Sequence, residues 1–428
     1  MEQETLRFTG HLRYGDKRFP VQFDTIAGVD FRLKIKLRSA AVQMAVDLHS
    51  AMGRPGGTGE VLVLEGCGES GETFFSETVD VGGIRIGSRD CDVSISARSA
   101  KISRRASEPL PFPVTRLWFR GFKSMLTPVV RSSLGSVEVR GGLKGIGRDD
   151  ASGFVAIHAD QATDLTDWLS RADELLTFLH RGLAFASGKR LQTPVLEVHS
   201  GDRRDCTYFE GEGFSGSLAP IHFMNRGPFV DALVKRFEKN VPFQDSLWTV
   251  VGWLHIDTPF DEARFLMSMT AIETLCEHVV PKSKTTLMDK KKYRPLRERL
   301  ISLVDEAGLT PLETIVLTNR IKQANGLPLS QKLCALREHY KLSANFFTDD
   351  AFADLGGLRN DLVHSGRRKG HDVWPKIVFV RELLSQVVFR ELDYTGPHES
   401  YLNGHATISG ANEEAKMETK SAPGNTPG

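Results

Sequence analysis

Residues 259–280 read PFDEARFLMSMTAIETLCEHVV, and apolar side chains recur along this stretch every three or four positions. That spacing places them on one face of an α-helix. Asp257 or Thr258 is suited to cap the helix, and Pro259 is suited to its first turn. The stretch therefore predicts a core helix, whose apolar face consists of Phe265, Leu266, Met269, Ile272, Leu275, Cys276 and Val279.

Similar helical patterns continue on both sides of this stretch. Glycines fall where several of these helices are expected to end, at Gly308, Gly326 and Gly366. We therefore predict an all-α helical bundle domain over residues 226–395. Its further helices are expected at 243–254, 294–307, 311–325, 330–341, 349–364 and 374–393.

The first part of the chain instead has short apolar runs separated by Gly and Pro. Many short strands with glycine-rich turns are typical of a β-sandwich or an irregular barrel. Regular crossover helices are lacking, which argues against a doubly wound parallel sheet. One amphipathic helix at 161–188 and two strands at 194–198 and 206–209 complete a β-rich domain over residues 1–225. We therefore expect an α+β multidomain protein.

The last stretch, residues 396–428, differs in composition from both domains. Aliphatic residues become sparse, and Gly, Pro, Ser, Asn and Glu dominate. Such a segment buries too little apolar surface to offset the entropy lost on ordering, so we predict a disordered tail.

The overall composition is that of an ordinary globular protein, with 428 residues and a net charge of only +1. That charge excludes a globally basic nucleic-acid coat but not local basic patches. The five cysteines form no C-x-x-C pair, which predicts reduced thiols and no metal site of the zinc-ribbon type. The acidic, polar N-terminus and the lack of long apolar runs lead us to expect a cytoplasmic protein with no membrane contact.

Residues 358–366 read LRNDLVHSG and carry the main candidate chemistry. Arg359 and His364 lie about 140° apart on an ideal helix, whereas Asn360 and His364 share a face. The Arg and the His can therefore converge only if the last turn unwinds at residues 365–366, or if a second protomer supplies one of them. Four apolar residues place the segment on a helix that faces a core, namely Phe352, Leu355, Leu358 and Leu362.

A plain structural interpretation of this segment remains open. The Arg would be an exposed side chain, and the His would interact with the dipole at the end of its helix. A basic run directly follows and would either hold an RNA backbone or form a solvated loop, namely Arg367, Arg368 and Lys369. A second basic stretch at 282–294 is interpreted first as a mobile loop between two helices and second as an RNA contact.

Residues 66–71, GCGESG, match the G-x-G-x-x-G pattern of dinucleotide-binding sites. A strand-like segment follows at 73–75, where a pyrophosphate site requires a helix. We therefore predict a β-turn. The chain contains no H-E-x-x-H, G-x-S-x-G or Walker A pattern.

Residues 359–364, RNDLVH, resemble the R-x4–6-H signature of HEPN domains, including the polar residue that follows the Arg. Residues 269–275 resemble the early helix of Apea-like HEPN domains, and residues 317–321 with the helix after them also resemble that subgroup. The β-rich half resembles the N-terminal domain paired with such HEPN domains in anti-phage proteins. The resemblance covers the helical half closely and the β-rich half loosely.

This resemblance implies a metal-independent endoribonuclease that needs no cofactor and acts as a homodimer. The substrate would be RNA, with tRNA as one candidate, and the N-terminal domain would sense a phage-derived trigger in abortive infection. The implied catalytic residues are Arg359, Asn360 and His364, the RNA contacts are Arg367, Arg368 and Lys369, and the supporting residues are Glu273 and Asp361. RNA supplies its own nucleophile in the 2′-hydroxyl, a histidine transfers protons near neutral pH, and an arginine stabilises charge on a phosphate.

Two alternatives remain open from the residues alone. A non-catalytic HEPN module would bind RNA or nucleotide, or would dimerise and regulate. A β-sandwich that binds carbohydrate or peptide would carry an accessory helical bundle. We also expect a dimer on physical grounds, because two copies of one Arg and one His would enclose a phosphate-sized cleft.

Overall fold

The computed structural model divides the chain into two compact units, Met1–Asn240 and Val241–Gly428, each described here by itself. The first unit is rich in β-strands and the second is helical, so the coarse α+β expectation is confirmed. The described residues are 4–28, 30–38, 42–50, 52, 60–86, 91–125, 129–142, 151–161, 164–211, 218–239, 241, 243–255, 258–365, 372–402 and 404–409.

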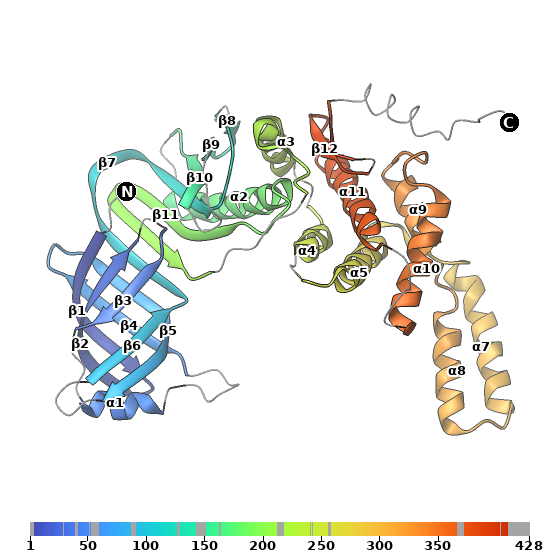
Figure 1. Cartoon of the computed structure of the whole chain (residues 1–428), viewed down its shortest axis with the longest axis horizontal. Helices are drawn as coiled ribbons and strands as arrows, with labels where there is room; N and C mark the ends of the chain where they lie inside the picture. The colour runs from blue at the N-terminus through green and yellow to red at the C-terminus, as the bar shows by residue number, and fades with distance from the viewer. Residues whose placement is uncertain are drawn as a thin grey trace. The chain divides into compact units, whose positions relative to one another are not determined.

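Six antiparallel strands at the start of the first unit close into a barrel (Figure 1). Around the barrel the order is β1, β2, β3, β6, β5 and β4, and β4 pairs with β1 to close the ring. Closure leaves each of these strands with a neighbour on both sides, which removes exposed sheet edges. The strands are β1 (Glu4–Tyr14), β2 (Lys17–Ala27), β3 (Leu33–Leu37), β4 (Leu62–Gly68), β5 (Thr73–Ile86) and β6 (Cys91–Ala97).

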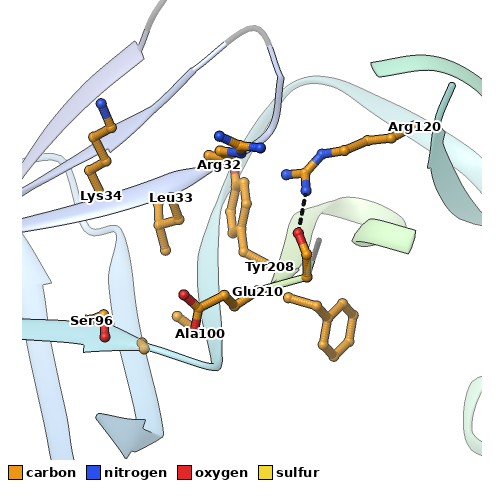
Figure 2. A pocket seen from close by; sticks show the side chains of 11 residues that line it. Arg32, Leu33, Lys34, Ser96, Ala100, Arg120, Tyr208 and Glu210 are labelled. Carbon is orange, nitrogen blue, oxygen red and sulfur yellow. Dashed lines mark hydrogen bonds between the residues drawn. The ribbon is translucent and has the colours of Figure 1, made fainter. Parts of the chain in front are cut away.

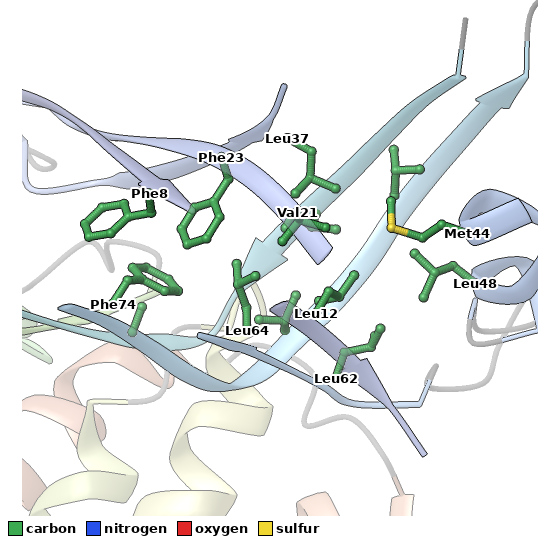
Figure 3. Close-up of a cluster of buried hydrophobic side chains, with 14 of the residues drawn as sticks. Phe8, Leu12, Val21, Phe23, Leu37, Met44, Leu48, Leu62, Leu64 and Phe74 are labelled. Carbon is green, nitrogen blue, oxygen red and sulfur yellow. The ribbon is translucent and has the colours of Figure 1, made fainter. Parts of the chain in front are cut away.

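Inward-facing apolar side chains fill this barrel (Figure 3). The rings of Phe8 and Phe23 stack with their centroids 5.3 Å apart, and Phe74 meets Phe23 edge-on at 5.1 Å. The short helix α1 (Val42–His49) adds Met44 and Leu48 to the same core. Burying each large side chain stabilises the fold by about 1.5–3 kcal/mol, so alternation along the strands determines which face lies inside.

A long two-stranded ribbon extends the same sheet beyond the barrel, to which the pairing of β5 with β7 joins it. It consists of β7 (Ser99–Arg120) and β11 (Gln192–Phe209), which pair antiparallel along most of their length. The ribbon bends where its register shifts beside Gly201, which adopts a positive φ of 58°. The far half of β7 continues into β10 (Ala151–His158), β9 (Gly135–Gly141) and β8 (Val130–Ser132).

Helix α2 (Leu165–Ala186) packs on β7 and β10, beyond the barrel. Its N-cap is Asp164, whose carboxylate accepts a hydrogen bond from the backbone N–H of Asp167. Trp168 is buried, and its indole N–H donates to the carbonyl of Leu134 at 2.9 Å. The helix predicted at 161–188 is therefore present.

The structure corrects two expectations about the strands of the first unit, one in the ribbon and one in the barrel. The two strands predicted at 194–198 and 206–209 are parts of the single strand β11, because pairing with β7 carries the chain through the polar stretch between them. The barrel strands of residues 4–37 did not stand out as apolar runs. The predicted β-turn at 66–71 joins β4 to β5 and contains Gly71 at φ 89°.

The first unit ends later than the predicted boundary at residue 225. Helix α3 (Arg226–Glu238), which follows the 3₁₀ turn η1 (Phe223–Asn225), packs on α2 and β8. The Glu238 carboxylate accepts hydrogen bonds from the backbone N–H and the hydroxyl of Ser133. These contacts place the first helix beyond residue 225 with the β-rich unit.

The second unit is built around α5 (Asp261–Val279), which contacts α4, α9, α10 and α11. This is the helix predicted from residues 259–280, and its predicted apolar face is buried except for Leu266, which is partly buried. The cap predicted at Asp257 or Thr258 is not formed by Thr258, because the N-cap is Phe260 and makes no side-chain capping bond; Asp257 lies outside the described residues. The other helices are α4 (Asp245–Leu254), α6 (Lys282–Thr285), α7 (Lys290–Glu306), α8 (Pro311–Gln323), α9 (Leu329–His339), α10 (Asp349–Ser365) and α11 (Trp374–Glu391).

The start of the predicted tail is ordered, which corrects the expectation of disorder from residue 396. Strands β12 (His398–Ser400) and β13 (Ala406–Ile408) form a small hairpin with buried residues. Polar contacts to α11 hold it, since Gln386 contacts His398 and the Glu382 carboxylate accepts from the backbone N–H of Tyr401. Residues 410–428 lie outside the described residues.

Among the described residues, no helix combines the length and the apolar character that crossing a membrane requires.

Candidate functional site

The candidate site lies on α10, whose apolar stripe anchors it in the helical unit. Phe352, Leu355, Leu358 and Leu362 are at most 4% exposed, as their spacing predicts. The opposite side of the helix faces outward and carries Asn360, Asp361, Val363 and His364. The core thus fixes the helix while its polar face remains accessible.

The Arg359 side chain, at the border of these two faces, is held by α5. Its Nη2 donates to Oε2 of Glu273 at 3.3 Å, and its Nη1 contacts Oδ1 of Asn360 at 3.5 Å. The Arg359 and Glu273 side chains are 36% and 34% exposed, so water screens their ion pair. Glu273 therefore orients a guanidinium that stays open to solvent.

Glu273 belongs to a row of alternating charges that crosses three helices. Lys332 on α9 lies 4.0 Å from the Glu273 carboxylate and 2.5 Å from that of Glu277, one turn farther along α5. Lys282 on α6 forms an ion pair with the same Glu277. Hydrogen bonds from Lys282 and Lys332 lower the pKa of Glu277, which keeps this carboxylate charged.

Lys332 and Glu277 are members of the site region that the sequence analysis missed. A signal was present, because Glu273 and Glu277 are four residues apart and share one face of α5. Two carboxylates on one helix face repel unless cations approach them. The sequence did not indicate which lysine approaches, since Lys332 is 12% exposed on a helix whose neighbouring residues are core.

His364 lies in the last turn of α10 and is exposed. It makes no hydrogen bond or ion pair with any part of the chain that the structure describes. The helix continues through Ser365, so the last turn does not unwind there to bring His364 toward Arg359. The five-residue separation thus leaves the two side chains about 140° apart around the helix and about 7.5 Å apart along it.

The face of α10 that carries His364 is unobstructed around its glycines. Gly356, Asn360 and His364 follow one another at four-residue intervals and lie on one side of the helix. A Cβ atom added at Gly356 or Gly357 would meet nothing within 4 Å in the described structure. This surface allows another backbone or a ligand to approach α10 closely.

Two basic stretches were predicted beside the site. The run Arg367, Arg368 and Lys369 lies outside the described residues. The stretch at 282–294 is not a loop, because α6 occupies its start and α7 begins at Lys290. Asp289 caps α7 by accepting from the backbone N–H of Lys291, a local signal that the sequence analysis did not use.

Within the described ranges, no group of three or more His, Cys, Asp or Glu side chains is arranged to hold a metal ion. The described part of the site offers a guanidinium, an amide, an imidazole and a supporting carboxylate. Side chains of these types are chemically able to bind and polarise a phosphate and to transfer a proton.

Comparison of the chain with protein-family models, with curated proteins and with solved structures gives no match. The functional assignment therefore depends on the residues of α5 and α10 and on their geometry.

Proposed function

We propose that the helical unit is a HEPN-type endoribonuclease site, used in anti-phage abortive infection and completed in a homodimer. The observation that supports this proposal is the Arg359 guanidinium, oriented by Glu273 at the margin of an open helix face that also carries Asn360 and His364. The role in defence and the phage-derived trigger rest on the resemblance described above.

The reaction would use the substrate's own 2′-hydroxyl. Its oxygen attacks the adjacent phosphorus while the bond from phosphorus to the 5′-oxygen breaks, leaving a 2′,3′-cyclic phosphate and a 5′-hydroxyl end. His364 would take the proton from the 2′-hydroxyl, and His364 of the second copy would give one to the leaving oxygen. Arg359 would stabilise charge on the phosphate oxygens, and Asn360 would position them by hydrogen bonding.

The dimer is needed because one copy of α10 keeps Arg359 and His364 on different sides. Two copies of α10 packed face to face across a two-fold axis would set each Arg359 near the other copy's His364. The open surface at Gly356 and Gly357 would allow that close approach. RNA would then bind in the cleft between the two copies.

A cleavage assay with purified full-length protein and total RNA tests the proposal. His364→Ala should lower cleavage at least about a hundredfold, because general acid–base catalysis contributes that much or more. His339→Ala provides a matched control, since His339 is also an exposed histidine in the last turn of a helix. Equal cleavage by the parent and His364→Ala proteins would overturn the assignment.

A non-catalytic role is the second candidate, favoured by the fact that Arg359 already contacts Glu273 and Asn360 within one chain. In that case the helical unit would bind RNA or nucleotide without cutting it. The same assay separates the two, because this candidate predicts no 2′,3′-cyclic phosphate ends from the parent protein and RNA binding that survives His364→Ala.

A further inference from the structure

A pocket in the β-rich unit lies outside everything assigned above. It has a volume of about 320 Å³ and opens where β3 and β6 of the barrel meet the first residues of β7 and the end of β11 (Figure 2). Small-molecule sites commonly start at this size. The pocket is therefore large enough for a compact ligand.

Three cationic side chains line this pocket. Arg32 and Lys34 come from β3 and the residue before it, and both are exposed. Arg120 is only 4% exposed and is fixed by hydrogen bonds to the carbonyls of Asp30 and Gly211 and to the side chain of Gln192. Arg32 also pairs with Asp30 at 3.4 Å. The lining thus contains one arginine that hydrogen bonds hold in place and two exposed cationic side chains. This concentration of positive charge favours an anionic ligand.

The end of β11 adds aromatic rings and a carboxylate to the same lining. Tyr208 is partly buried, and Phe209 is 38% exposed. Figure 2 shows Arg32, Tyr208 and Glu210 between the barrel strands and Arg120. Exposed aromatic rings stack with nucleobases, and a carboxylate accepts hydrogen bonds from the amino groups of bases.

We propose that this pocket binds a nucleotide. Arg32 and Lys34 would hold the phosphate, Tyr208 or Phe209 would stack on the base, and Glu210 would accept from its N–H groups. An adjoining pocket of about 310 Å³ shares Arg120, Phe209 and Glu210 and is lined by Arg190, which leaves room for a second nucleotide. The ligand is therefore a free nucleotide or the 5′-phosphorylated end of a strand.

Isothermal titration calorimetry on the full chain tests this inference. All proteins would carry His364→Ala, so that oligonucleotides stay intact whether or not the helical unit cleaves RNA. The ligands would be GMP, guanosine, inorganic phosphate and a 5′-phosphorylated tetranucleotide. We expect GMP to bind at least about tenfold more tightly than guanosine or phosphate alone, since each of these lacks one half of the contacts.

Variants in the pocket supply the matched comparison. Arg32→Ala with Lys34→Ala should weaken GMP binding at least about tenfold. Lys36→Ala is the control, because Lys36 lies two residues along the same strand, is also exposed and is absent from the lining. Glu210→Gln should weaken binding of GMP but not of phosphate.

The result also identifies the source of the ligand. Tighter binding of the tetranucleotide than of GMP would assign the site to a strand end, and the reverse would assign it to free nucleotides. No binding of either, or equal losses in the Lys36→Ala variant and the double variant, would overturn the inference. Neither result depends on cleavage, so the nuclease proposal stands or fails separately.

Discussion

The Arg359 guanidinium is held by one carboxylate, and the neighbouring carboxylate on the same helix binds two lysines. Glu273 contacts Arg359, whereas Glu277 binds Lys282 and Lys332. The two glutamates thus differ in what they orient, although they are one helical turn apart. This difference separates a residue that positions the site from one that stabilises the bundle.

We predict different effects on cleavage when each glutamate is neutralised. Glu273→Gln should lower kcat for RNA cleavage about tenfold through misplacement of Arg359, and should cost at most about 1 kcal/mol of stability because the ion pair is solvent-screened. Glu277→Gln should leave cleavage nearly unchanged and should likewise cost at most about 1 kcal/mol of unfolding free energy, because its side chain is 37% exposed and water screens its ion pairs. Urea unfolding measures the stability of the two variants, and single-turnover kinetics measures their cleavage rates. Equal losses of cleavage rate in the two variants would contradict a positioning role for Glu273.

A partly buried histidine, His255, makes the stability of the helical unit depend on pH. Burial, aided by the charge of Arg381, lowers the pKa of His255 to about 3. In the unfolded chain a histidine titrates near 6.5, so between these values the unfolded state binds more protons than the folded one. Stability from this group is complete above pH 6.5 and is lost as pH falls toward 3.

We therefore predict that lowering the pH from 7 to 5 destabilises the parent by about 2 kcal/mol through His255. His255→Gln removes the titrating group, so this variant should lose less stability over the same interval. Denaturant unfolding at both pH values measures the difference. If parent and variant lose the same amount, His255 is not the group responsible.

At the scale of elements, the hairpin of α7 and α8 has a large apolar surface without a partner in the described chain. These two helices contact mainly each other, and no residue of α8 is buried (Figure 1). Its first turns carry cations and its tip carries acids at Asp305, Glu306 and Glu313. The exposed apolar residues are Leu287, Leu296, Leu303, Leu312, Ile315, Val316 and Leu317.

We predict that a second copy of this hairpin covers that surface. An antiparallel pair would set each acidic tip against the basic first turns of the other copy, so charge and hydrophobic contact favour the same arrangement. Leu312→Glu with Ile315→Glu should lower the mass of the assembly in light scattering while the chain stays folded, and RNA cleavage should persist because the α10 face is a separate contact. Met224→Glu, at an exposed apolar residue of the other unit, is the control. A double variant with the same mass as the parent would exclude the hairpin as a contact between copies.

The sequence predicted elements well where burial is one-sided. The stripe of Phe352, Leu355, Leu358 and Leu362 placed α10 correctly, because a helix with one buried face repeats its apolar residues every three or four positions. The sequence analysis did not predict strands β1 to β3. Their inward-facing residues, such as Phe8 and Leu12, alternate with polar residues and form no continuous apolar run. The sequence analysis also missed the hairpin β12–β13, because the buried residues of β12 are polar and take their partners from α11 and from the facing strand.

The candidate site was predictable in its residues but not in its contacts. Arg359, Asn360 and His364 could be named from one short segment, because helical spacing fixes their relative directions. The pairing of Arg359 with Glu273 spans 86 residues of chain, and such a pairing depends on how α5 and α10 pack. Local patterns do not encode that packing.

For the whole molecule, the division into two units makes a prediction about cooperativity. Each unit has its own hydrophobic core, with Phe119 buried in the first and Phe265 in the second. Domains with separate cores generally unfold as separate units. We therefore expect two transitions in calorimetry of the full chain.

Core substitutions assign these transitions. Phe119→Ala and Phe265→Ala should each destabilise one unit by about 3–5 kcal/mol, so each should lower one transition temperature and leave the other unchanged. A single transition that both variants lower would show that the units fold as one.

The path of the chain through the ribbon has a consequence for how this protein can vary. The strands β8, β9 and β10 and the helix α2 all lie between β7 and β11, and Arg105 faces Arg203 across that ladder. These four elements thus form an insertion whose entry and exit are neighbours, and α3, which follows β11 in the chain, packs against α2 and β8 of that insertion. The insertion can therefore become longer, become shorter or be exchanged, through evolution or protein engineering. The register of the barrel strands need not change.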